Sequence, residues 1–184
     1  MKNSTMRKLT FIYSLFCMSI IAISQTNYWE TSSYVIAFKI KNAKTLVTGN
    51  FFDLNTRITF DTLDLSKSRF EGSVSVQTIN TGISIRDKHL KKSEYFNMEK
   101  HSVISIKSKS IAKRSANRYV AVCTLTIKDK EKEVELPFTF RASNGRAKFA
   151  AILTINRLDF GLGSKSVIMA SSVDVLLDLN VIKK

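Results

Sequence analysis

The sequence predicts a single all-β domain preceded by an export signal. Three observations lead to this prediction: apolar and polar residues alternate with a period of two over most of the chain, turn residues separate the alternating runs, and helical periodicity is scarce. The chain has 184 residues, which suits one domain that buries a real core. With 44% hydrophobic and 24% charged residues, it is neither a disordered tail nor a multi-span membrane protein.

The N-terminus has the features of a secretory signal peptide. Three basic residues among the first eight precede an uncharged, mostly apolar run over residues 9–23, and Ala22 and Ser24 then have the A-x-S spacing of a cleavage site. The run is shorter than the roughly 20 residues that a helix needs to span a bilayer, which disfavours the alternative of an uncleaved anchor. We therefore expect a signal peptide over residues 1–24, a mature domain over residues 25–184, and a periplasmic or secreted location.

Cleavage after residue 24 would leave Cys123 as the single cysteine of the mature chain, so a disulfide within a monomer is excluded. Cys17 does not fit a lipoprotein signal, because Phe16 stands where such a signal carries a small residue. Stability must then come from the core. The sequence is compatible with a monomer or a homodimer.

Short alternating runs continue from residue 34 to the C-terminus. Their apolar members are Tyr34, Ile36, Phe38 and Ile40; Phe70, Val74 and Val76; Val134, Leu136, Phe138 and Phe140; Phe149, Ala151, Leu153 and Ile155; and Val173, Val175, Leu177, Leu179 and Val181. With the segments 49–60, 103–111 and 119–127, they predict about eight strands, at the spacing of an antiparallel sandwich or barrel. Such a barrel can be filled by its own side chains or can hold one small ligand, and periodicity alone favours the filled interior.

Turn and helix signals fit between these runs. Asn144-Gly145 predicts a type I′ hairpin turn, and the polar residues 129–131 predict another connection. The G-L-G stretch at 161–163 indicates a turn or bulge. Residues 86–96 (RDKHLKKSEYF) carry helical spacing, so we expect a short helical segment over one opening of the sheet structure.

Four segments carry a family resemblance. Residues 47–51 read V-T-G-N-F; residues 84–90 read S-I-R-D-K-H-L and are followed by Y-F-N at 95–97; residues 125–127 read L-T-I; and residues 155–163 read I-N-R-L-D-F-G-L-G. In this order they resemble the V-x-G-x-F, R-D-x-H-L, L-T-I and I-N-R-x-D-F-G-x-G elements of the YceI family. The resemblance implies an eight-stranded antiparallel lipocalin-like barrel whose tunnel binds long isoprenoid or related lipid chains, usually in the periplasm.

Strand-face parity then selects a tunnel lining. The predicted lining residues are Phe38, Phe70, Val74, Val76, Phe138, Phe140, Phe149 and Leu153. Arg86, His89 and Arg157 are candidate contacts for the polar head of a ligand, and each also has a structural interpretation. Asp87 can bond backbone N–H groups at a helix start, while Arg86 and His89 can tie the helix to neighbouring strands. Arg157 and Asp159 would share a face of a regular strand and form an ion pair or a latch between adjacent strands.

No catalytic or metal-binding pattern is present in the sequence. His89, His101 and Cys123 do not have a zinc-site spacing, and no G-x-S-x-G, Walker-type or G-x-G-x-x-G motif occurs. We therefore expect no metal, no cofactor and no enzymatic activity. A bound isoprenoid or quinone-like lipid would be a ligand.

The positive charge falls largely on polar alternate positions and turns, which predicts a solvated outer face. The lysines concerned are Lys39, Lys41, Lys107, Lys109, Lys128, Lys130, Lys132 and Lys148. The formal net charge of +14 would fall to +11 with the loss of the three basic residues of the signal peptide. Such a surface favours contact with anionic membrane lipids. Nucleic acid is disfavoured as a partner by export and by the lack of an aromatic-basic RNA-binding motif.

The leading hypothesis is a non-enzymatic protein that sequesters or transports an isoprenoid-type or other long-chain apolar lipid in its barrel. Two alternatives stay open. The first is an enzyme that acts on an apolar substrate with Arg86, Asp87 and His89 at the tunnel mouth. The second is a filled barrel that serves as a structural or interaction protein and binds no ligand.

Overall fold

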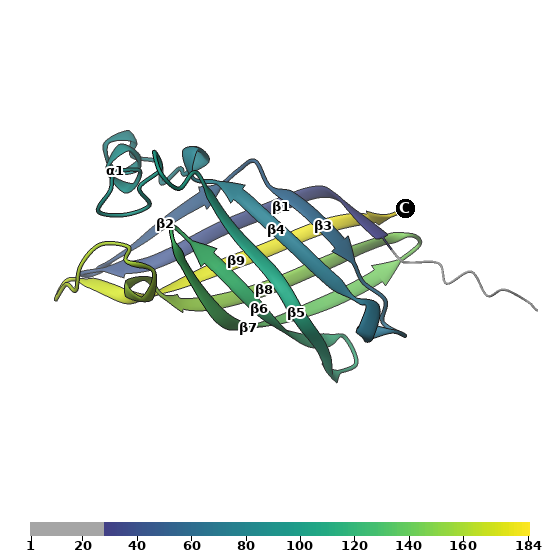
Figure 1. The fold of residues 1–184 in the computed structure, drawn as a ribbon. Coiled ribbons are helices and arrows are strands. Elements are labelled where there is room, and N and C mark those ends of the chain that lie inside the picture. Colours follow the sequence, from purple (N-terminus) through teal and green to yellow (C-terminus); the bar gives the residue numbers. More distant parts are fainter. Residues whose placement is uncertain (1–27) are drawn as a thin grey trace, which may run out of the picture.

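The computed structural model describes residues 28–184, which form a closed antiparallel β-barrel with one short helix (Figure 1). The strands are β1 (Tyr28–Asn42), β2 (Thr45–Phe51), β3 (Asn55–Thr59), β4 (Arg69–Ser75), β5 (Val103–Ser115), β6 (Arg118–Ile127), β7 (Lys130–Ser143), β8 (Arg146–Asn156) and β9 (Met169–Lys183). The helix is α1 (Ser84–Leu90), and three 3-10 turns are η1 (Leu65–Lys67), η2 (Val76–Thr78) and η3 (Arg157–Phe160). The predicted signal peptide lies outside the described residues.

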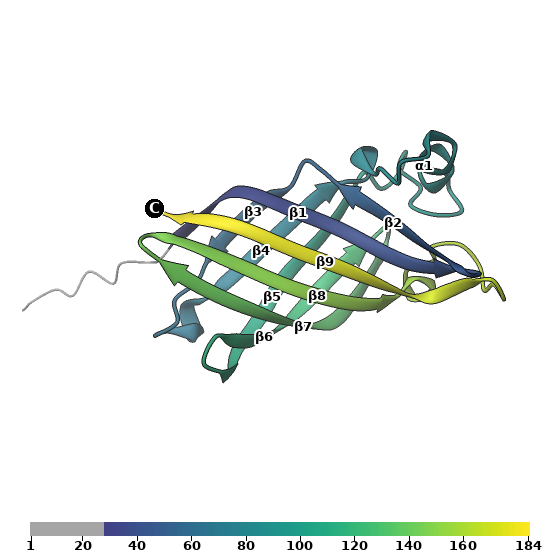
Figure 2. The same cartoon turned by 180° about the vertical axis from the view of Figure 1, so that it is seen from behind.

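Nine strands fill eight positions around the barrel. Strand β2 pairs with residues 36–42 of β1, whereas β3 pairs with Tyr28 and Trp29 of the same strand, so β2 and β3 share one position. The other edge of β1 pairs with β9 along most of its length, which closes the sheet on itself. Figures 1 and 2 show this cylinder from two sides, with α1 at one end and the C-terminus at the other. The prediction of an eight-stranded antiparallel barrel is confirmed.

The turns between the strands agree in part with those predicted from the sequence. Asn144 and Gly145 have positive φ angles of 49° and 72°, as the predicted I′ turn between β7 and β8 requires. The turn between β6 and β7 is formed by Lys128, with φ of 58°, and Asp129, because Lys130 already pairs with Ile127. The predicted connection at residues 129–131 was therefore placed slightly too late.

Three element boundaries also differ from the prediction. Strand β1 begins at Tyr28 rather than near residue 34, because its polar early part is held by pairing with β9 across a bulge after Thr31. The predicted run 49–60 is broken between β2 and β3, where Asp53 takes a positive φ of 61°. The helix ends at Leu90, and turns follow it instead of a helix to residue 96.

One end of the barrel interior is filled by an aromatic plug. It lies where β1 begins, and its members are Trp29, Phe60, Tyr119, Phe138, Phe140 and Phe149. The Phe60 side chain is 1% exposed, and its ring centroid lies 4.7 Å from that of Phe140 and 5.1 Å from that of Tyr119. The Trp29 indole N–H donates to the Phe60 carbonyl at 2.9 Å. Edge-to-face packing of this kind leaves no room for a ligand at this end.

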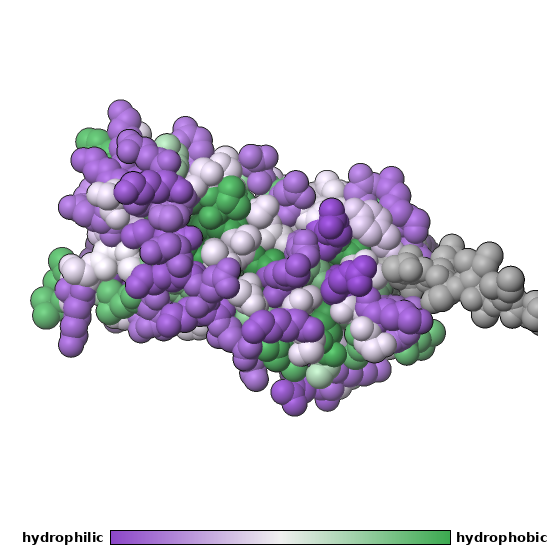
Figure 3. Space-filling view, viewed as in Figure 1, coloured by the Kyte–Doolittle hydropathy of each residue, from purple (hydrophilic) through white to green (hydrophobic). Residues whose placement is uncertain are grey.

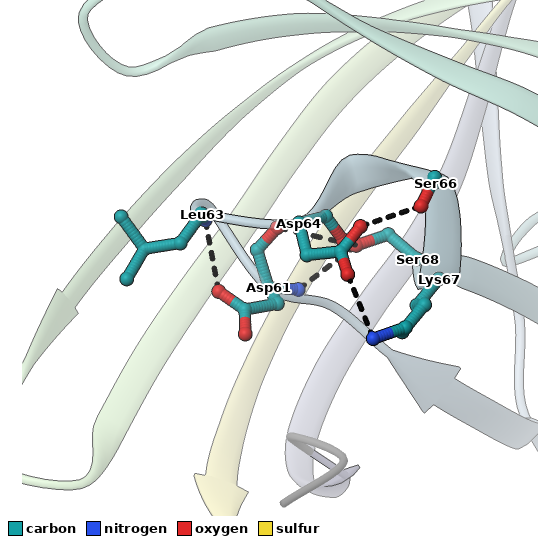
Figure 4. Close-up of polar contacts among 6 residues, drawn as sticks. All are labelled: Asp61, Leu63, Asp64, Ser66, Lys67 and Ser68. Atoms are coloured by element: carbon teal, nitrogen blue, oxygen red, sulfur yellow. Dashed lines mark hydrogen bonds and ion pairs between the residues drawn. The ribbon is translucent and has the colours of Figure 1, made fainter. Parts of the chain in front are cut away.

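The loop over residues 60–68 connects β3 to β4 at the plugged end, and its own side chains fix it (Figure 4). The Leu63 N–H donates to the Asp61 carboxylate at 2.8 Å, and the Asp61 N–H donates to the Ser68 hydroxyl at 2.9 Å. Lys67 forms an ion pair with Asp64 at 3.0 Å. The loop exposes the Leu63 side chain almost completely. Among residues 28–184, no helix has the length and hydrophobicity to cross a bilayer.

Candidate functional site

The other half of the barrel interior contains a cavity of about 360 Å³, at the end that carries α1. Most of its lining is apolar, because alternate residues of the long strands point inward, as Ile36, Phe38 and Ile40 of β1 do. The polar side chains that reach it are Asn42, Ser73, Ser105, Tyr95, Arg86, His89 and Arg157. We call this space the main cavity.

A second cavity of about 90 Å³ adjoins the main cavity on the side of the aromatic plug. The two share the lining residues Ile36, Leu54, Gly72, Ile106 and Leu177. Phe138 and Phe149 of the plug form part of the wall of the smaller cavity. The interior is thus hollow at the α1 end, narrow in the middle and filled at the opposite end.

The structure brings six of the eight predicted lining residues to these cavities. The main cavity is lined by Phe38, Val74 and Leu153, and the smaller cavity is lined by Phe70, Phe138 and Phe149. Phe140 lines neither, because it lies within the plug, 5.4 Å from Trp29 between ring centroids. Val76 also lines neither, since strand β4 ends at Ser75 and the Val76 side chain is buried in η2.

Sequence reasoning missed other prominent lining residues. Phe51, Leu90 and Phe96 belong to the segments that carried the family resemblance, but they were not placed in the lining. Val175 and Leu177 lie on the apolar face of the last predicted strand, so the same parity argument could have identified them.

Gly49 shapes one wall of the main cavity. It pairs with Phe38 between β2 and β1, and the Phe38 ring lies across it. A Cβ atom at Gly49 would lie 2.4 Å from Cζ of Phe38 and 2.9 Å from Cγ2 of Thr81. The glycine of the V-T-G-N-F segment is therefore required for the position of this aromatic ring.

A hydrogen-bond network holds the start of α1 at the cavity mouth. Nε of Arg86 donates to the Thr81 hydroxyl at 2.8 Å, and Nη2 donates to the Thr81 carbonyl at 2.8 Å. The Thr81 N–H donates to the Asp87 carboxylate at 2.9 Å. Asp87 thus accepts from a backbone N–H group at the helix start, as its structural interpretation expected. Arg86 bonds to the segment before the helix and not to a neighbouring strand, and it also lines the main cavity.

His89 lies at the same mouth, between the main cavity and solvent. Its side chain is 49% exposed and lines the cavity. Nε2 of His89 is 3.8 Å from a carboxylate oxygen of Glu94, and the ring centroid is 5.1 Å from that of Tyr95. A polar group that protruded from the cavity would meet this imidazole.

Arg157 has a different environment from the one expected. It lies in η3 and not on a regular strand, so it forms no latch with Asp159, whose carboxylate accepts from the Asn156 amide instead. Its side chain is 2% exposed and lines the main cavity. The guanidinium donates to the carbonyls of Ala170, Leu162 and Ser164 at 2.9, 2.6 and 2.9 Å. Arg157 therefore ties the loop after η3 to the barrel wall.

No group of three or more His, Cys, Asp or Glu side chains with the arrangement of a metal site occurs among residues 28–184. Cys123 is fully buried on β6, and burial raises the pKa of its thiol to about 12. The polar groups at the mouth suit contact with a ligand head, whereas the cavity itself suits an apolar chain.

Comparisons with known proteins place the chain in a family. A model of the YceI-like domain matches residues 29–181. A UPF0312 protein from Serratia proteamaculans (strain 568) is 26% identical over 141 residues, which cover 73% of each chain. Another UPF0312 protein, from Pectobacterium carotovorum subsp. carotovorum (strain PC1), is 25% identical over 156 residues and 81% of each chain.

Solved structures share the fold. BcnA from Burkholderia cenocepacia superposes with a TM-score of 0.77 at 20% identity, over 80% of this chain and 95% of BcnA. A YceI protein from Campylobacter jejuni gives a TM-score of 0.69 at 20% identity, over 74% and 84%. A polyisoprenoid binding domain from Saccharophagus degradans gives 0.64 at 16% identity, over 86% and 99%. Because the family model matches nearly all of the described barrel, the chain belongs to the YceI family.

Proposed function

We propose that this protein binds a long apolar lipid chain, of the isoprenoid type, in the main cavity and sequesters or transports it without enzymatic conversion. The observation that carries the proposal is a largely apolar cavity of about 360 Å³ inside a closed barrel. A filled barrel would have no such space. The Saccharophagus degradans neighbour, described as a polyisoprenoid binding domain, has the same fold and supports this ligand class.

Binding would be driven by the removal of apolar surface from water. Each buried methylene contributes roughly 0.8 kcal/mol, so a chain of several isoprene units needs few polar contacts for tight binding. The aromatic plug closes the far end, so the chain enters from the α1 end with its polar head last. Phe38, Val74 and Leu153 would contact the part of the chain near the mouth, and Phe138 and Phe149 would contact its tip.

The three polar candidates have different tasks in this proposal. His89 is half-exposed at the mouth and is the best placed to contact a polar head. Arg86 uses two of its nitrogens on Thr81 and would meet the head from the cavity side. Arg157 would mainly stabilise the cavity wall, since three of its N–H groups donate to backbone carbonyls.

We also propose that the mature protein lies in the periplasm or outside the cell, in line with the predicted signal peptide.

The direct test is native mass spectrometry of the exported protein purified from its native host, followed by organic extraction. We expect one prenyl lipid per barrel. Repeated preparations that are empty, together with no binding of added isoprenoids, would contradict the proposal. Conversion of an added isoprenoid to a new product would contradict its non-enzymatic part.

A further inference from the structure

Two exposed apolar tips flank the main cavity at the α1 end. The first consists of Ile83 and Ile85, at the start of α1, with side chains that are 53% and 80% exposed. The second consists of Val167 and Ile168, in the loop between η3 and β9, which are fully and 61% exposed. Figures 1 and 2 place α1 and this loop at the same end of the barrel, and Figure 3 shows apolar atoms projecting there among hydrophilic ones.

The second tip is held in place by the surrounding structure. The Ile168 carbonyl accepts from the Ala43 N–H at 2.5 Å, and the Ser166 hydroxyl accepts from the Ile168 N–H at 3.2 Å. Arg157 binds carbonyls on both sides of the loop, at Ser164 and Ala170. These bonds fix the loop so that its apolar side chains point away from the core. Packing within the protein therefore does not account for the apolar character of these two exposed positions.

Positive charge is present at this end as well as on the barrel wall. Wall lysines such as Lys107 and Lys148 form ion pairs at 2.8 and 2.7 Å with Glu71 and Asp178. The α1 end carries exposed lysines without an ion pair among the described residues: Lys44, Lys88, Lys92 and Lys165. Positive charge that is free of ion pairs therefore accompanies the apolar tips.

We infer that the α1 end docks onto a lipid bilayer that carries anionic head groups. The apolar tips enter the boundary between head groups and acyl chains, and the lysines contact the anionic groups. The mouth of the main cavity then faces the membrane, so a lipid chain passes between bilayer and barrel without crossing open water. This inference rests on the proposed function for its purpose, but docking itself does not require a bound ligand.

The test is sedimentation of the exported protein with phosphatidylcholine vesicles that contain phosphatidylglycerol, compared with vesicles of phosphatidylcholine alone. We expect binding to the anionic vesicles that weakens as salt is added. The variant I85S/V167S should bind about ten-fold less tightly, because it removes apolar side chains from both tips. L63S is the matched control, since Leu63 is 95% exposed at the plugged end and its loss should leave vesicle binding unchanged.

Two results would overturn the inference: vesicle binding by I85S/V167S that is as tight as that of the wild type, or no binding of the wild type to anionic vesicles. Sedimentation velocity can give a third such result. If the wild type is a dimer and I85S/V167S is a monomer, the tips form an interface with a second copy of the chain.

Titration with retinol, a fluorescent isoprenoid alcohol, separates docking from ligand binding. Retinol binding without vesicle binding refutes docking alone, and vesicle binding without retinol binding supports docking while it contradicts the carrier function.

Discussion

Replacement of Gly49 by alanine should reduce ligand binding by moving the Phe38 ring into the main cavity. The new Cβ would lie 2.4 and 2.6 Å from Cζ and Cε1 of Phe38, far below the contact distance of about 3.5–4.0 Å. Cγ2 of Thr81 would also lie too close, at 2.9 Å from the same Cβ position. The ring must therefore turn inward, toward the cavity that it already lines.

The size of the effect follows from the displaced ligand volume. If the ring excludes two methylenes of the bound chain, binding loses about 1.6 kcal/mol, which is about fifteen-fold in Kd. The crowding should also lower the free energy of unfolding by about 1–2 kcal/mol. This is the cost of overpacking, reduced by a small gain because alanine gives the unfolded chain less conformational freedom than glycine. Retinol titration measures the first quantity, and urea unfolding measures the second.

A second substitution makes the prediction specific. The double variant G49A/F38L should recover most of the binding, because leucine leaves room for the new methyl group. F38L alone serves as the control for the loss of the aromatic ring. Wild-type affinity in G49A, or no recovery in G49A/F38L, would refute the steric argument.

Three further predictions concern other parts of the barrel. Phe138→Ala should extend the smaller cavity into the plug and lengthen the longest fatty alcohol that competes with retinol, while it costs about 3–5 kcal/mol of stability; an unchanged length limit would contradict the role of Phe138. Arg157→Met should leave three carbonyls without their donor, cost about 1–3 kcal/mol, and speed amide hydrogen exchange in residues 161–170; unchanged exchange there would contradict it. Because burial raises the pKa of Cys123 from 9.0 to about 12, the free energy of unfolding should fall as pH rises from 9 toward 12, and C123A should show a smaller decrease than the wild type in urea unfolding.

Much of the fold could be predicted from local pattern, and the errors have local causes. The alternation along β7 and β8 and the Asn144-Gly145 turn were sufficient to fix that hairpin, because both signals act over a few residues. The early part of β1 carries no clear alternation, and its strand conformation depends on pairing with the distant β9. The break near Asp53 contains neither glycine nor proline, and its turn signal is limited to Asp53 and Asn55, which tolerate a turn but do not require one.

The candidate site could be predicted less completely, since parity identifies an inward face but not the depth along the barrel axis. Phe138 and Phe140 lie two apart on β7 and both point inward, yet Phe138 lines the smaller cavity whereas Phe140 is enclosed by the plug. That difference depends on rings contributed by other strands, above all Phe60. Arg157 was a similar case, because the carbonyls that bind its guanidinium come from residues that only the folded loop brings together.

The unequal filling of the barrel separates stability from binding. Cys123 is the one cysteine among residues 28–184, so these residues form no disulfide with one another. A barrel that was hollow throughout would lose dispersion contacts along its whole length. Here the plug concentrates aromatic burial at one end, where Phe60 packs against four other rings. The strands beyond it are held by the hydrogen-bond ladder, which closes the barrel between β1 and β9, and by a smaller buried cluster of Ile36, Phe51, Val74 and Ile79. The cavity at the α1 end is therefore compatible with a stable fold.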